Sequence, residues 1–179
     1  MRNPFIIGEK IYLRPLEKSD LSGSYLSWVN DPEVTRYMET GTFPTNLEKL
    51  EEYYSFMTTS PNYVILAIID KELDKGKHIG NITLNNINWI HRIVNLGFMI
   101  GDKDYWGKGY GTEAIELMVK YAFATLNLHK ISVGIYADHI GSIRAFKKAG
   151  FIQEAKLEGE LYRDGKYRDK IIMRAMTYE

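Results

Sequence analysis

The chain has 179 residues, 45% of them hydrophobic, and its 23 basic and 23 acidic residues give a formal net charge of zero. This length suffices for one stable core, so we expect a single domain over residues 1–179. The interspersed charges exclude the basic surface that nucleic acid or an anionic membrane needs. The absence of cysteine excludes disulfides, thiolate metal sites and a cysteine nucleophile. Because no apolar run reaches membrane length and no secretory pattern opens the chain, we expect a cytoplasmic protein without membrane contact or metal.

The predicted elements follow one another without repeats or linkers. Thr45, with Glu48 three residues later, is a capping-box candidate for the second helix, and Ser19 or Asp20 is the expected cap of the first. A charged turn at residues 70–77 separates the second and third strands. The apolar periodicities predict strands at 11–16, 62–69, 78–84, 93–100, 131–137, 151–157 and 167–176, and helices at 21–29, 47–57, 113–126 and 140–149.

Residues 105–114 are the most informative segment, because three alternating glycines stand there between an expected strand and an expected helix. Such a turn directs several main-chain N–H groups, and the positive end of a helix, toward one point. Side chains in place of the glycines would block a ligand or forbid the φ values that let the amides converge. Lys108 and Thr112 add a charge and a hydroxyl. The segment predicts a pyrophosphate site, although a turn without ligand shows the same spacing, and neither the P-loop nor the dinucleotide pattern is present.

The order of these elements resembles the GNAT superfamily of N-acetyltransferases from residue 11 to residue 176. The segment Trp106–Gly111 is similar to the family's acetyl-CoA motif, Gln/Arg-x-x-Gly-x-Gly/Ala, with Trp106 in the Gln/Arg position. The stretches 139–151 and 13–20 are similar to the RimJ/RimL branch, with His139 in the place of an asparagine. The resemblance implies an α/β (α+β) GNAT fold. Its mixed central sheet would have about six to seven strands, splayed at the acetyl-CoA site and flanked by about four helices.

The resemblance also implies acetyl-CoA as co-substrate. In this family the pantetheine arm lies in the gap of the splayed sheet, where an unpaired strand edge offers hydrogen-bonding groups to its amides. The implied cofactor-binding residues are Met99, Ile100 and Gly101 for this arm, and Gly107, Lys108, Gly109, Tyr110, Gly111 and Thr112 for the diphosphate.

The implied reaction is direct transfer of the acetyl group to a primary amine, with Ser142, Asn95 and His139 as candidate catalytic residues. The family's usual tyrosine proton donor corresponds to Phe146, and its usual glutamate base corresponds to Asn95, so neither chemistry is available. Ser142 could protonate the leaving thiolate or only satisfy helix amides. Asn95 could orient water or the amine, or be buried and bonded to neighbouring backbone. His139 could accept the amine proton or only cap the last helix.

The acceptor that we expect first is a protein N-terminal α-amine, because its pKa of about 7.7–8.0 lies well below the value of about 10.4 for lysine. Trp28 and Tyr37 could bind this substrate or fill the core, and most charges near the end of the chain could simply be solvated. The candidate substrate-binding residues are Trp28, Arg36, Tyr37, Tyr167 and Asp169.

Two main alternatives remain open, and polyamine or antibiotic amines are further possible acceptors. Residues 28–34 and 79–89 also resemble transferases of surface-polysaccharide synthesis, which suggests a nucleotide-linked amino sugar bound near Tyr37, Trp89, His91 and Arg92. The missing tyrosine and glutamate instead suggest a non-catalytic acyl-CoA-binding module. Relatives often form homodimers, and the aromatic content of 13% is compatible with one.

Overall fold

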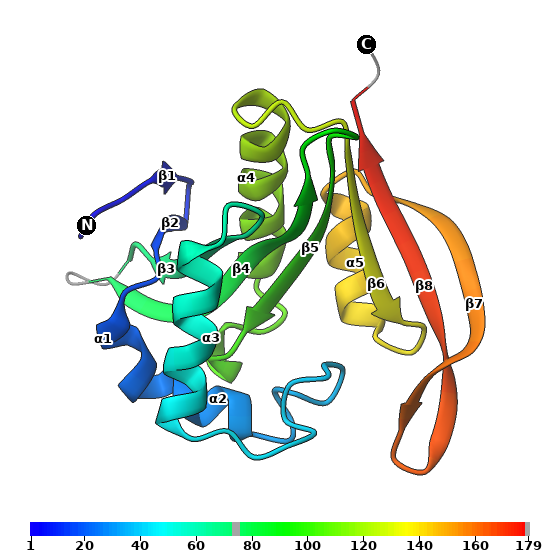
Figure 1. Ribbon diagram of the computed structural model, residues 1–179, viewed down its shortest axis with the longest axis horizontal. Coiled ribbons are helices and arrows are strands. Elements are labelled where there is room, and N and C mark those ends of the chain that lie inside the picture. The colour runs from blue at the N-terminus through cyan, green and yellow to red at the C-terminus, as the bar shows by residue number, and fades with distance from the viewer. Residues whose placement is uncertain (73–75, 178–179) are drawn as a thin grey trace.

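A twisted mixed sheet runs through the molecule and carries helices on both faces (Figure 1). The computed structural model describes residues 1–72 and 76–177, so the middle of the expected turn at 70–77 lies outside the described part. The described strands form one eight-stranded sheet in the order β1-β2-β3-β4-β5-β6-β8-β7. The strands are β1 (Ile6–Ile7), β2 (Ile11–Pro15), β3 (Val64–Asp70), β4 (Lys77–Asn88), β5 (Ile93–Ile100), β6 (Lys130–Tyr136), β7 (Ile152–Arg163) and β8 (Lys166–Met176).

The sheet confirms the expected fold class, with one strand more than expected. Strand β1 has two residues, which is too short to show a period in the sequence. Strand β7 continues to Arg163, well past the expected end at residue 157, because register shifts at two bulges let it follow β8 to the hairpin turn.

The helices lie close to their expected positions, but two of the expected caps are wrong. The first helix begins after Glu17, whose main-chain N–H donates to the Asp20 carboxylate at 2.8 Å. The second begins after Asn46, whose side chain accepts from the Lys49 amide at 3.0 Å. The helices are α1 (Lys18–Asp20), α2 (Leu26–Asn30), α3 (Leu47–Thr59), α4 (Tyr110–Ala124) and α5 (Ile140–Lys148), with a π-helical turn at Leu21–Tyr25 and a 3-10 turn at Lys103–Tyr105.

The sheet separates two apolar cores. Helices α4 and α5 cover one face, and α1 to α3 cover the other (Figure 1). Alternation along β5 divides its side chains between these faces. Leu96 and Phe98 belong to the core under α4 and α5, whereas Met99 belongs to the core under α1 to α3. The exposed Asn95 shares the parity of Met99, so it faces the α1–α3 side.

A gap opens between β5 and β6, as expected for a splayed sheet. These two strands are parallel neighbours, and their pairing ends at Asn95 and Ser132. Beyond that point β5 stays with β4 as far as Ile100, and β6 stays with β8 as far as Tyr136. The two halves of the sheet therefore diverge and leave facing edges without partners (Figure 1).

No helix in residues 1–72 or 76–177 has the length and apolar character needed to cross a bilayer.

Candidate active site

The glycine turn lies directly after β5, at the wide end of the gap. Gly107 and Gly109 have φ values of 72° and 91°, a left-handed backbone conformation that a side chain disfavours. Gly111 serves packing, because a Cβ there would lie 3.0 Å from the Phe98 ring. The three glycines therefore give the turn its shape and bring α4 close to β5.

Helix α4 begins without a side-chain cap. Its first main-chain bond runs from the Glu113 N–H to the Gly109 carbonyl at 3.1 Å. The N–H groups of Tyr110, Gly111 and Thr112 precede this bond and thus have no acceptor within the helix. Free amides at the positive end of a helix can bind an anion such as a diphosphate, so the anion site expected here stays a prediction that this geometry permits.

Lys10 joins this turn from the other end of the chain. Its ammonium lies 3.4 Å from the Lys108 carbonyl and 5.7 Å from the centre of the Tyr110 ring. The Glu113 carboxylate fixes the segment that leads into strand β2, because it accepts a hydrogen bond from the Lys10 amide at 3.0 Å. Sequence reasoning missed Lys10, since no local pattern links it to a turn about a hundred residues away.

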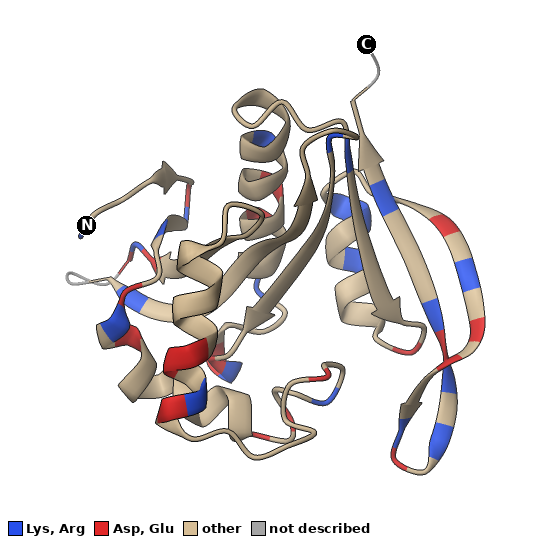
Figure 2. Ribbon diagram, in the orientation of Figure 1, with Lys and Arg blue, Asp and Glu red and all other residues tan. Residues whose placement is uncertain are grey.

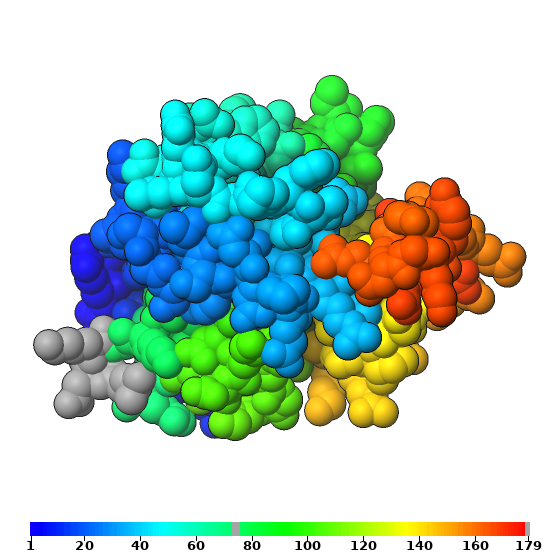
Figure 3. Space-filling model, turned by 90° about the horizontal axis from the view of Figure 1, so that it is seen from below, coloured from blue at the N-terminus to red at the C-terminus, as the bar shows by residue number. Residues whose placement is uncertain are grey.

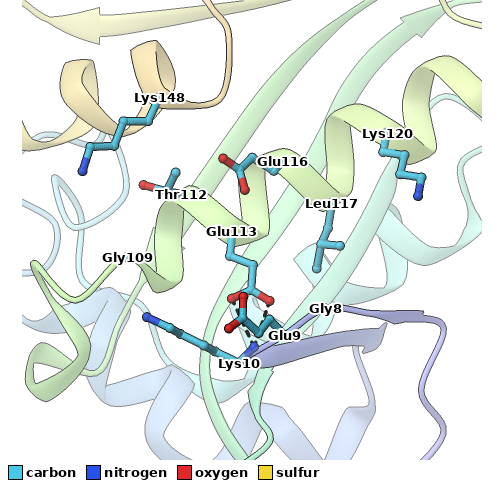
Figure 4. A pocket seen from close by; sticks show the side chains of 10 residues that line it. All are labelled: Gly8, Glu9, Lys10, Gly109, Thr112, Glu113, Glu116, Leu117, Lys120 and Lys148. Atoms are coloured by element: carbon cyan, nitrogen blue, oxygen red, sulfur yellow. Dashed lines mark hydrogen bonds between the residues drawn. The ribbon is translucent and has the colours of Figure 1, made fainter.

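A cavity of about 460 Å³ extends from this turn along the outer side of α4. Lys10 and Lys148 extend toward the side on which the Thr112 hydroxyl points (Figure 4). Three lysines and three glutamates line the cavity, and the two lysines nearest the turn, Lys10 and Lys148, suit the phosphates of coenzyme A. The lining residues are Gly8, Glu9, Lys10, Gly109, Thr112, Glu113, Glu116, Leu117, Lys120 and Lys148.

The free edge of β5 differs in detail from the sequence expectation. The Gly101 N–H donates to the Ile79 carbonyl at 2.9 Å, so it points toward β4. Because main-chain groups alternate in direction along a strand, those of Phe98 and Ile100 point into the gap, and those of Met99 do not. The Ile100 carbonyl accepts from the Trp106 indole at 2.7 Å. Phe98, which the sequence reasoning did not include, therefore joins Ile100 on the edge that faces the gap.

Ser142 is buried on α5 with 7% of its surface exposed, and its hydroxyl makes no hydrogen bond to a described residue. It does not satisfy helix amides, so the hydroxyl remains available. Phe146, one turn further along α5, is 1% exposed and packs its ring 5.5 Å from Phe98 and 4.9 Å from Phe151. An apolar core thus occupies the position where the family usually has tyrosine.

His139 precedes α5 but does not cap it through its side chain. Its ring instead stacks on Tyr37, with the ring centres 4.2 Å apart and the planes at 15°. Burial lowers the pKa of His139 below its ordinary value, and the nearby Asp138 opposes this shift in part. The imidazole is therefore neutral near pH 7 and able to accept a proton.

The face of β4 and β5 that lies toward α1–α3 carries neutral polar side chains beside the gap, and we expect the acceptor amine on this side. Asn95 pairs with Asn85 of β4 across the sheet. Asn95 is exposed and its side chain bonds to no described residue, so the alternative of a buried, bonded asparagine is wrong. Asn85 donates to the Thr83 hydroxyl at 2.9 Å. These amides and hydroxyls can orient an amine or a water molecule, but none can act as a strong base.

The expected substrate residues lie in three different places. Arg36 and Tyr37 lie beside His139 and Tyr136, at the mouth of the gap. Trp28 is a core residue under Gly101, where a Cβ would come within 2.0 Å of the indole. The other two lie on the β7–β8 hairpin. Tyr167 is 73% exposed beside Tyr162, and Asp169 holds the hairpin through Lys156 at 2.7 Å and the Gly159 amide at 3.0 Å.

The fold and the glycine turn define an acyltransferase of the GNAT class, and the family model of the acetyltransferase (GNAT) domain matches residues 10–152. The chain therefore belongs to this family and is an N-acetyltransferase that uses acetyl-CoA. Among residues 1–72 and 76–177, no group of three or more histidine and carboxylate side chains is placed to hold a metal ion.

Similar proteins include a spermidine N(1)-acetyltransferase of Escherichia coli K12, 29% identical over 91% of this chain and 84% of the relative. The crystal structure of a spermidine N-acetyltransferase from Vibrio cholerae, in complex with CoA and spermine, matches with a TM-score of 0.85 and 26% identity over 94% of this chain and 96% of that one. A putative ribosomal N-acetyltransferase of Bacillus subtilis is 29% identical over 54% of this chain and 52% of the relative.

Proposed function

We propose that residues 1–179 form one N-acetyltransferase domain that moves the acetyl group directly to a primary amine of low basicity, such as a protein N-terminal α-amine. The observation that carries the proposal is the position of the uncapped start of α4. It lies at the end of β5 where the gap to β6 is widest. A diphosphate bound to the amides of 110–112 would leave the pantetheine arm to enter this gap.

Acetyl-CoA supplies an activated thioester when bound. The amine nitrogen forms a bond to the acetyl carbon as the bond from that carbon to sulfur breaks, one proton leaves the amine and one reaches the sulfur. Ser142 supports protonation of the sulfur because its hydroxyl is uncommitted and lies at the start of α5. His139 takes the amine proton, directly or through water, because its lowered pKa keeps it neutral.

The neutral polar side chains on this face of β4 and β5 favour an amine that loses its proton easily. Asn85, Asn95 and Thr83 offer no carboxylate base, and an α-amine with a pKa of about 7.7–8.0 is partly neutral at pH 7 without one. The match to a putative ribosomal N-acetyltransferase, over about half of the chain, supports a protein acceptor.

A polyamine is a second candidate acceptor. The relatives named spermidine N-acetyltransferases cover most of this chain, which favours an acceptor of that kind. Homodimer formation stays a prediction.

Thiol release from acetyl-CoA tests the proposal with N-terminal peptides, spermidine and amino sugars as acceptors. We expect turnover with at least one amine, intersecting initial-velocity lines, and no acetylated protein by mass spectrometry, because direct transfer leaves no acyl-enzyme. Tight CoA binding without thiol release from any acceptor would instead identify an acyl-CoA-binding module.

A further inference from the structure

A narrow cleft beside Tyr37 gathers arginines from distant parts of the chain. It is a shallow surface crevice that encloses no space large enough for a water molecule, and six residues line it, namely Arg36, Tyr37, Tyr136, Arg163, Asp164 and Arg168. Three of these six carry a permanent positive charge. The established chemistry of acetyl transfer from acetyl-CoA does not explain them, because the diphosphate site lies at the start of α4.

The loop between α2 and α3 forms one wall of this cleft, and the β7–β8 hairpin forms the other. Arg163 joins the two walls, because its Nη1 donates to the Met38 carbonyl at 3.0 Å. Figure 3 shows the two segments in contact on one face of the molecule, with the region of α5 beside them. Neither the loop nor the hairpin contributes to the glycine turn, so the cleft lies on the side of the gap where we expect the acceptor amine.

The arginines retain unused hydrogen-bonding capacity. Arg36 is exposed and lies over the Tyr37 ring at 5.4 Å, without an ion pair to a described residue. Arg168 donates from Nη1 to Asp138, but its Nε–H is buried and has no partner among the described residues. A buried donor without an acceptor is costly, so Arg168 would gain a hydrogen bond if its guanidinium group turned toward an anion at the surface.

Lys170 adds a fourth cation on the same side. It pairs with Tyr136 across β6 and β8, and its side chain crosses Gly134, where a Cβ would come within 2.4 Å of the lysine Cε. Gly134 thus leaves room for the lysine to pass over β6. Lys170 makes no ion pair with a described residue.

The balance of charge is positive. Asp164 lies 3.9 Å from Arg163, and Asp138 pairs with Arg168, so two carboxylates stand against four cations. This surplus of positive charge would repel a polycationic acceptor. Guanidinium groups in a fork geometry suit phosphate or carboxylate oxygens.

We propose that Arg36, Arg163, Arg168 and Lys170 form an anion-binding subsite, and that the acceptor is an amine that also carries a phosphate or carboxylate group. The inference rests on the proposed function, because it names the substrate class of the same site. Tyr136 lies four residues beyond the last β5–β6 pair, or about 13 Å along the strand. An anion held beside Tyr136 would leave an amine several bonds away free to reach the gap.

The test compares thiol release with four acceptors: a nucleoside diphosphate-linked amino sugar, a peptide with an acidic second residue, a neutral peptide and spermidine. We expect kcat/KM for one of the two anionic amines to exceed the values for the other two acceptors at least tenfold. The amino sugar and the acidic peptide distinguish the source of the anion. A preference for spermidine or the neutral peptide would overturn the inference while leaving the acetyltransferase proposal intact.

Arg36→Gln probes the subsite with little risk to folding, because Arg36 is exposed. It should raise KM for the anionic amine roughly ten- to a hundredfold, with a smaller effect on kcat, as expected for loss of a charge-assisted hydrogen bond. The matched control is Arg144→Gln, an exposed arginine of α5 outside the cleft, which should leave KM unchanged. Equal KM values in the two variants would contradict the assignment.

Binding of inorganic pyrophosphate to the CoA-saturated protein gives a readout that needs no turnover. Bound CoA occupies the diphosphate site at α4, so calorimetry then reports on the cleft. We expect binding that Arg36→Gln weakens and Arg144→Gln does not. Absence of binding to the CoA-saturated wild-type protein would refute the subsite even if no acceptor is turned over.

Discussion

The left-handed glycines of the turn allow stability and cofactor binding to be separated. Gly109→Ala places a Cβ in open space, since its nearest neighbour is the Lys10 ammonium at 3.9 Å. The cost is therefore conformational, because alanine at a φ of 91° loses about 1–2 kcal/mol. For a chain of this size, this loss lowers Tm by roughly 2–8 °C.

If the turn relaxes to relieve this strain, the amides of residues 110–112 no longer converge on the diphosphate. Each lost charge-assisted hydrogen bond weakens binding by about 1.5–3 kcal/mol, so Kd for CoA should rise roughly ten- to a hundredfold. Isothermal titration calorimetry measures this change directly. The control is Gly165→Ala in the β7–β8 turn, with a φ of 75° and no neighbour within 4 Å. It should lose similar stability and keep its CoA affinity. Equal CoA affinity in the two variants would refute the placement of the diphosphate.

Three further outcomes follow from the site and the core. Ser142→Ala should lower kcat roughly a hundredfold with an unchanged Kd for CoA, and an unchanged kcat would exclude the hydroxyl as proton donor. The lowered pKa of His139 places the acid limb of kcat/KM below pH 6.5, and His139→Gln should abolish that limb in a pH–rate profile. Burial alone would raise the pKa of Asp20, but hydrogen bonds from Arg14 and a backbone amide hold this pKa below 3.8. The resulting stability is present at neutral pH, declines as pH falls below 3.8 and is lost below the lowered pKa. Asp20→Ala should cost about 3–5 kcal/mol in urea unfolding, against less than about 1 kcal/mol for Glu51→Ala in an exposed pair.

Strand β5 and the glycine turn could be predicted from the sequence because their signals are local. Strand β5 has the expected bounds, and the glycines of the following turn have the backbone angles that their spacing indicates. Each of these features depends on residues that are neighbours in the chain. The mixed, splayed sheet was implied by the resemblance to the GNAT superfamily, whereas the order of its strands was not predicted.

Details that depend on competition between neighbours were harder to predict. Asn46 caps α3 in place of Thr45, because both can accept from a helix amide and the backbone angles decide which does so. Thr45 is instead held by Asn30, which bonds to both its amide and its carbonyl. Similarly, His139 stacks on Tyr37 instead of capping α5, and its sequence position could not reveal that ring.

The cleft beside Tyr37 resisted prediction because long-range contacts build it. Arg36 reaches the cleft from the loop after α2, and Arg163 and Arg168 reach it from a hairpin more than a hundred residues later. Opposite charges balance over the whole chain, so composition conceals a local positive surplus that arises only on folding. The same reasoning limits what overall similarity says about the substrate. Relatives of this family share the fold that uses acetyl-CoA, whereas the loop after α2 and the β7–β8 hairpin, which we propose to contact the acceptor, can change charge without changing the fold.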